Sequence, residues 1–139
     1  MTRALVCALA GLACATPAWA DKAYDRCMDR ATINPQMSWC GELYLRRLGA
    51  ALNVAWKNAN ASLDQNSRAS DTPLQESRKN LLLEQRAWLK FREASCDFWA
   101  NGSFGRDGQI IHWAKCRATI TQERIAYLRG ISEFVREHQ

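Results

Sequence analysis

Residues 83–96 read LEQRAWLKFREASC, and this stretch decides the fold. It holds two aromatics, three cations and a cysteine within fourteen residues. We expect a packed helix in which Arg86 and Arg92 pair with Glu93, Asp97 or Glu123 and cover the neighbouring tryptophan. The alternative is a binding face, since Trp and Arg are enriched at interface hot spots. Helical spacing marks one side of this helix as buried, with Leu74, Leu81, Leu82, Trp88, Leu89 and Cys96 on it.

Further helical patterns lie on both sides of this stretch. Thr72 and Gln75 match a capping box, so the central helix is expected to run from Thr72 to about Trp99. Residues 101–108 contain three glycines and are expected to be irregular. A third long helix is predicted over residues 110–136. Its inward positions are Ala114, Ala118, Thr121, Ile125 and Leu128.

A first long helix is predicted from Asn34 as N-cap, with Pro35 at the first helical position, to about Leu63. Gly49 lies inside it at a cost of about 1 kcal/mol relative to Ala, which we interpret as room for another helix. Residues 64–71 are polar and predict a loop, and residues 22–32 predict a short helix. The apolar face of the first long helix carries Leu45, Leu48, Leu52, Ala55, Ala59 and Leu63.

The sequence therefore predicts an all-α fold. It is an antiparallel bundle of three long helices with a short N-terminal helical arm. Four cysteines follow residue 20, and an even number in an exported chain indicates two disulfides with three connectivities. We favour Cys27–Cys40 and Cys96–Cys116, because these pairings close the short loops of 13 and 20 positions.

The first twenty residues are typical of a cleaved secretory signal. Arg3 precedes an apolar run over residues 4–15, and residues 18–20 read AWA, a small-x-small cleavage pattern near Ala20. Cys14 suggests a lipoprotein alternative, but Gly11 stands where a lipobox usually has Leu. We therefore expect residues 21–139 to be one exported domain, periplasmic or secreted. Cleavage removes one arginine and no acid, so the net charge of +5 becomes +4.

Catalytic and nucleic-acid-binding patterns are missing from the sequence. Its two histidines, His112 and His138, lie in no metal-binding spacing, and His112 is expected to be a surface or loop-packing residue. Oxidised cysteines leave no thiolate nucleophile. The basic residues are spread among acids, which argues against nucleic acid as a partner. We predict no catalytic residue, no metal and no cofactor.

Residues 85–96 closely resemble the signature of the LprI-type lysozyme inhibitor domain, also called DUF1311. Cys27, Cys40 and Cys116 match further landmarks, so the resemblance runs from about Cys27 to Leu128. The family usually has an acidic residue where this chain has Gly49, Tyr at Trp56, and Gly-Gly-Ser at residues 101–103. The signature positions are Gln85, Arg86, Trp88, Phe91 and Arg92.

The resemblance implies a helical, secreted or lipid-anchored envelope protein, with lysozyme inhibition known for some members. A non-enzymatic inhibitor of a lysozyme-like muramidase is the leading hypothesis. An envelope adaptor that binds another exported protein or a cell-wall polymer is the alternative. A local acidic patch and the loop between Cys96 and Cys116 are the predicted contact surface, although an ordinary helix connection explains the loop equally well. The predicted contact residues are Glu93, Asp97, Asn101, Gly102, Ser103, Phe104 and Asp107.

Overall fold

The computed structural model describes residues 21–69 and 74–138. The predicted signal sequence and the Thr72 cap lie outside the described residues. The described part is helical throughout, apart from short connections. Its elements are α1 (Lys22–Arg30), α2 (Asn34–Ala69), α3 (Leu74–Ala100), α4 (Gly105–Asp107), the π-helical turn η1 (Gly108–His112) and α5 (Trp113–Glu137).

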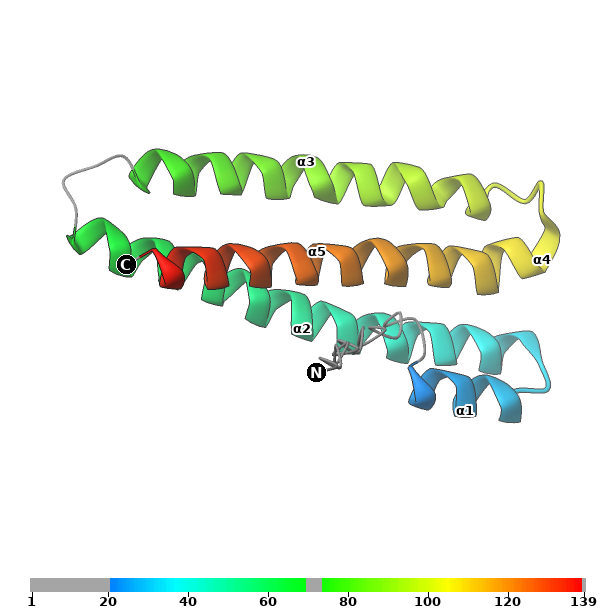
Figure 1. The fold of residues 1–139 in the computed structure, drawn as a ribbon. Coiled ribbons are helices and arrows are strands. Elements are labelled where there is room, and N and C mark those ends of the chain that lie inside the picture. Colours follow the sequence, from blue (N-terminus) through cyan, green and yellow to red (C-terminus); the bar gives the residue numbers. More distant parts are fainter. Residues whose placement is uncertain (1–20, 70–73, 139) are drawn as a thin grey trace, which may run out of the picture.

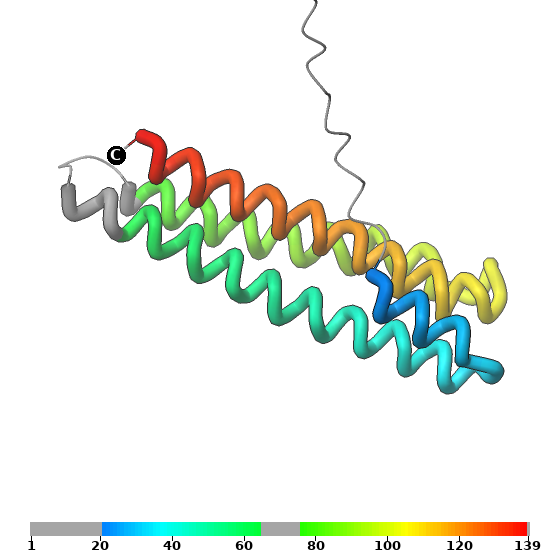
Figure 2. Tube along the Cα trace, turned by 60° about the horizontal axis from the view of Figure 1, so that its bottom comes forward, coloured from blue at the N-terminus to red at the C-terminus, as the bar shows by residue number. Residues whose placement is uncertain are grey.

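The three long helices lie side by side and alternate in direction along the chain (Figure 1). α3 is antiparallel to α2 and to α5, and short α1 doubles back along the start of α2 (Figures 1 and 2). The all-α bundle with an N-terminal arm is therefore confirmed. No helix in the described ranges is long and apolar enough to cross a membrane.

The main core lies between α2 and α5, with α3 packed across them. The predicted faces of α2 and α5 are confirmed, because their apolar residues at three- and four-residue steps are the ones buried. Each fully buried Leu or Ile contributes about 1.5–3 kcal/mol to the free energy of unfolding. The cluster consists of Leu52, Ala55, Ala59, Leu63, Leu81, Ile125, Leu128 and Val135.

A second, smaller cluster fastens α1 to the bundle. The rings of Tyr24 and Tyr44 stack with centroids 5.0 Å apart, and the Cys27–Cys40 disulfide lies beside them. The Asp21 carboxylate begins α1 by accepting the backbone N–H of Ala23 at 2.9 Å. Burial raises the pKa of Asp21, but hydrogen bonds, above all that from Arg47, outweigh it and hold this pKa below its usual value.

Several boundaries and faces differ from the predictions. α2 continues to Ala69, so most of the predicted loop over residues 64–71 is helical, because polar residues can extend a helix already nucleated by packing. Leu82 and Leu89 are exposed, 41% and 38%, because the buried stripe of α3 runs through residues 81, 85, 88, 92 and 96. A Cβ placed on Gly49 meets nothing within 4 Å, so no other helix approaches closely at this position. The interpretation of Gly49 as room for another helix is therefore wrong.

The predicted irregular segment over residues 101–108 is also shorter than expected. Only residues 101–104 are non-helical, and α4 and η1 lead directly into α5. Gly102 and Gly105 have φ of 83° and 62°, the left-handed region that glycine adopts freely. Gly108 instead has a helical φ of -58°, and a glycine is required there because a Cβ would lie 2.5 Å from Phe104 Cβ. Two of the three glycines thus allow the chain to turn, and the third allows Phe104 to pack closely against the backbone.

Candidate functional site

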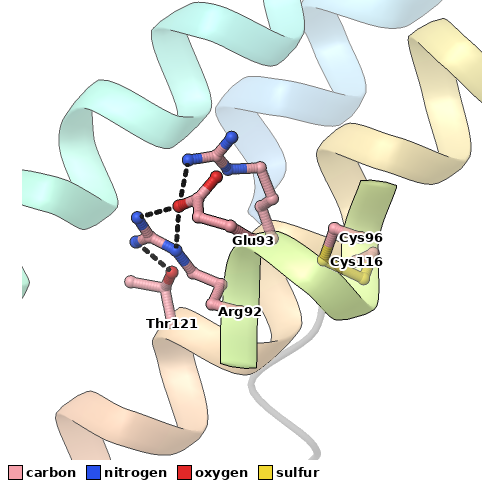
Figure 3. Close-up of a disulfide and its surroundings, with 6 residues drawn as sticks. Arg92, Glu93, Cys96, Cys116 and Thr121 are labelled. Carbon is pink, nitrogen blue, oxygen red and sulfur yellow. Dashed lines mark hydrogen bonds and ion pairs between the residues drawn. A yellow bond between two sulfur atoms is a disulfide. The ribbon is translucent and has the colours of Figure 1, made fainter. Parts of the chain in front are cut away.

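The predicted contact residues gather at the end of the bundle where α3 turns into α5. The Cys96–Cys116 disulfide joins these helices just before the turn (Figure 3), and Cys96 is fully buried. Both favoured disulfides are therefore present. A covalent link so close to the turn limits how far the two helix ends can separate.

Hydrogen bonds within the turn hold its backbone in one shape. Asn101 Oδ1 accepts the N–H of Ser103 at 2.9 Å, and the carbonyl of Gly102 accepts the N–H of Gly105 at 3.1 Å. The Gln109 side-chain amide donates to the carbonyl of Ala100 at 3.2 Å, which satisfies one of the free carbonyls at the end of α3. The turn therefore presents its side chains from a fixed frame.

An aromatic cluster covers this end of the bundle. The ring centroids of Phe98, Trp99 and Phe104 lie 5.0–5.2 Å from one another. His112 stacks on Trp99 at 5.0 Å, in agreement with the predicted loop-packing role. Phe98 and Phe104 remain 55% and 44% exposed, so the cluster offers apolar surface to a partner. Only Phe104 of this cluster was among the predicted contact residues, although Phe98 and Trp99 lie just before the turn.

The three predicted acidic contacts lie in different environments. Glu93 Oε1 lies 2.8 Å from an Arg92 guanidinium nitrogen and 2.7 Å from one of Arg117, so two cations offset its charge. Figure 3 shows the Arg92 and Glu93 side chains meeting beside the disulfide. Asp97 and Asp107 are exposed and form no ion pair with any described residue. They are therefore the acids that a basic partner could reach without breaking an internal pair.

Comparison with known proteins decides the family. The model of the family described as lysozyme inhibitor LprI matches residues 27–128. The chain belongs to the LprI family. A search of curated proteins and a search of solved structures each found no match.

The LprI signature divides between the two sides of α3. Gln85, Trp88 and Arg92 lie on the inward stripe, whereas Arg86 and Phe91 point outward, with Phe91 59% exposed. Arg92 lies over the Trp88 ring at 5.0 Å and pairs with Glu93, which agrees with the packed-helix prediction. Arg86 forms no ion pair with any described residue, so the prediction is wrong for it. Most of the signature therefore holds α3 against α5.

Arg124 of α5 is the centre of a buried polar network in this LprI-family chain. Its side chain is 4% exposed and donates to Glu84 at 2.6 Å and to Gln85 at 2.8 Å. Its guanidinium carbon also lies 5.7 Å from the ring centroid of Trp88 and 5.0 Å from that of Tyr127, within reach of cation–π contacts. One terminal nitrogen of Arg124 has no hydrogen-bond partner in the described structure. The network fixes the relative rotation of α3 and α5, and sequence spacing alone could not reveal it.

Proposed function

We propose that this chain is an exported, non-enzymatic protein that binds and inhibits a lysozyme-like muramidase. The observation that carries the proposal is the match to the lysozyme inhibitor family over residues 27–128. Two disulfides and the signal-like residues 1–20, with cleavage near Ala20, support export to the periplasm or outside the cell.

We propose a non-enzymatic role because the side chains that usually carry catalysis are engaged in other contacts. All four cysteines after residue 20 are in disulfides, which removes the thiolate nucleophiles. His112 is stacked on Trp99, and His138 on Phe134 near the end of the chain. In the described ranges no group of three or more metal-binding side chains occurs. These features favour contact rather than turnover as the mode of action.

The inhibitory surface is proposed to be the turn end of α3 and α5. It consists of the exposed aromatic cluster and the acids Asp97 and Asp107, with Glu93 nearby, on a frame held by the Cys96–Cys116 disulfide. The residues of the turn are Asn101, Gly102, Ser103 and Phe104. A preorganised, protruding end loses little conformational entropy when it enters a cleft.

The net charge of the domain affects how it can bind a basic partner. Chicken-type lysozymes are strongly basic, so a domain of net charge +4 is repelled from them at long range. At physiological salt the Debye length is about 8 Å, and local complementarity then outweighs distant charges. Exposed acids at the turn supply that complementarity. An adaptor that binds another exported protein or a cell-wall polymer is the second candidate, and the basic surface favours it for anionic polymers.

Asp97→Lys is expected to weaken inhibition at least about tenfold, because it turns a local attraction into a repulsion. The inhibition constant against a chicken-type lysozyme measures the effect. Glu123→Lys is the matched control, since it makes the same charge change at an exposed position of α5. If both variants inhibit alike, Asp97 is not a contact residue.

A further inference from the structure

A groove lined by arginines opens between α2, α3 and α5 in the disulfide-bonded half of the bundle. Its volume is about 440 Å³, within the range of roughly 300–1,000 Å³ that is typical of small-molecule sites. The groove lies within the matched residues 27–128, and its Arg92 is a signature position, but the proposed inhibitory surface does not include it. The groove is lined by Glu42, Leu45, Arg46, Gly49, Arg92, Trp113, Arg117 and Thr121.

Packing fixes the orientation of the two inner arginines. Arg92 lies 5.0 Å from the Trp88 ring centroid and Arg117 lies 4.7 Å from that of Trp113. Their side chains are only 17% and 21% exposed. When a guanidinium stacks on an indole, its N–H groups still point outward in the plane of the guanidinium, where they can donate hydrogen bonds. Arg92 already donates to Glu93 and Thr121 through all three of its guanidinium nitrogens, so the preoriented donors that remain on the inner wall are those of Arg117.

The outer wall adds a third arginine from a different helix. Arg46 of α2 lies 4.9 Å from the Trp39 ring centroid, and its nearest carboxylate, Glu42, is 3.6 Å away. Both of these side chains are 61% exposed, so their ion pair is weak and easily exchanged. Arg46 can thus turn toward an incoming anion at little cost.

The charges around the groove do not balance. Arg46, Arg92 and Arg117 face two carboxylates, those of Glu42 and Glu93, which leaves an excess of one positive charge. Arg117 donates only one hydrogen bond to the described residues, through one terminal nitrogen to Glu93. A guanidinium has five N–H groups, so Arg117 can donate further hydrogen bonds to a ligand without breaking its bond to Glu93.

Gly49 is one of the residues that line the groove. A Cβ at this position would meet nothing within 4 Å, so the glycine is not required by helix packing. It nevertheless costs about 1 kcal/mol relative to Ala in a helix interior. The missing side chain leaves free space in the wall between Arg46 and the arginines of the other two helices.

We propose that this groove binds a carboxylate-bearing ligand of small-molecule or short-peptide size. Arg46 and Arg117 hold the carboxylate, because the guanidinium fork matches its planar geometry and one negative charge balances the excess. Leu45 and Trp113 pack against the apolar part of the ligand. A free acid and an acidic peptide residue share this chemistry. The proposal does not rest on lysozyme binding.

The test is a nuclear magnetic resonance titration of the oxidised, exported protein. N-acetylglutamate and an acetylated glutamate tripeptide are the two probes, with inorganic phosphate as a comparison. We expect a saturable shift of the Trp113 indole N–H. Binding of both probes identifies a free acid as sufficient, and binding of the tripeptide alone identifies a peptide source. No saturable shift with either probe would overturn the proposal, and equally tight phosphate binding would overturn its carboxylate assignment.

Variants locate the binding in the groove. Arg46→Gln and Arg117→Gln are each expected to weaken probe binding about tenfold. Arg129→Gln removes the same charge from an exposed position of α5 outside the groove and should bind as the parent does. Gly49→Glu fills the groove with a carboxylate of its own and should abolish binding. Because the Arg46 side chain is exposed, Arg46→Gln should stay folded. It therefore tests the site even if Arg117→Gln fails to fold. Equal affinity of Arg46→Gln and Arg129→Gln would contradict the site.

Discussion

Replacing both Cys96 and Cys116 by Ala is expected to lower the free energy of unfolding by about 3 kcal/mol. The disulfide closes a loop of 20 positions, so its removal returns that loop-closure entropy to the unfolded chain. Cys96 is also fully buried at the α3–α5 contact, which adds a packing loss. Chemical denaturation monitored by circular dichroism measures the change.

Comparing this variant with one that lacks the other disulfide shows which of the two bonds matters for inhibition. Cys27→Ala with Cys40→Ala is the matched control, because this bond closes 13 positions and fastens only α1 to α2. Removal of Cys96–Cys116 should also weaken inhibition, since it frees the turn that carries the proposed contacts. A stability loss below about 1 kcal/mol for this pair would contradict the idea that the disulfide holds the turn end together.

Glu93→Lys is the second large effect, a loss of about 2 kcal/mol in the free energy of unfolding, less than for a fully buried ion pair because the Glu93 side chain is 42% exposed. The substitution places a cation between Arg92 and Arg117, whose side chains are mostly buried and now share the Glu93 carboxylate. Repulsion among three cations and the loss of three charge-assisted hydrogen bonds, two from Arg92 and one from Arg117, act in the same direction. Thermal and denaturant unfolding of the variant and the parent measure it.

This result bears on the earlier hypothesis that Glu93 is a contact residue. Asp97→Lys, by contrast, should change the free energy of unfolding by no more than about 0.5 kcal/mol relative to the parent. Asp97 is exposed and forms no ion pair with any described residue. Loss of inhibition in Glu93→Lys must therefore be judged against its loss of stability. If Glu93→Lys is as stable as Asp97→Lys, the bridge to the two arginines contributes nothing.

The fold could be predicted from the sequence because apolar spacing is a local signal. The α2 and α5 stripes through Ala59 and Leu128 follow three- and four-residue steps, and burial follows them closely. The prediction failed where helix ends depend on packing rather than on breakers. α2 passes through polar residues to Ala69, and the chain is already helical at Gly105.

The candidate site was predictable only in part. Its position at the α3–α5 turn follows from the cysteine spacing and the glycines. The state of Glu93 does not, because Arg117 approaches it from another helix, 24 positions away. The groove is harder still, since Arg46, Arg92 and Arg117 come from three helices and no spacing rule joins them. Pairing across helices depends on the relative rotation of α3 and α5, which the buried Arg124 network sets.

The most direct test of the proposed function is binding of oxidised residues 21–139 to a chicken-type lysozyme, by calorimetry alongside a muramidase activity assay. The proposal predicts submicromolar binding at physiological salt, with loss of activity at matching concentrations. Absence of binding at both low and physiological salt would contradict it, and would leave an envelope adaptor as the function to pursue.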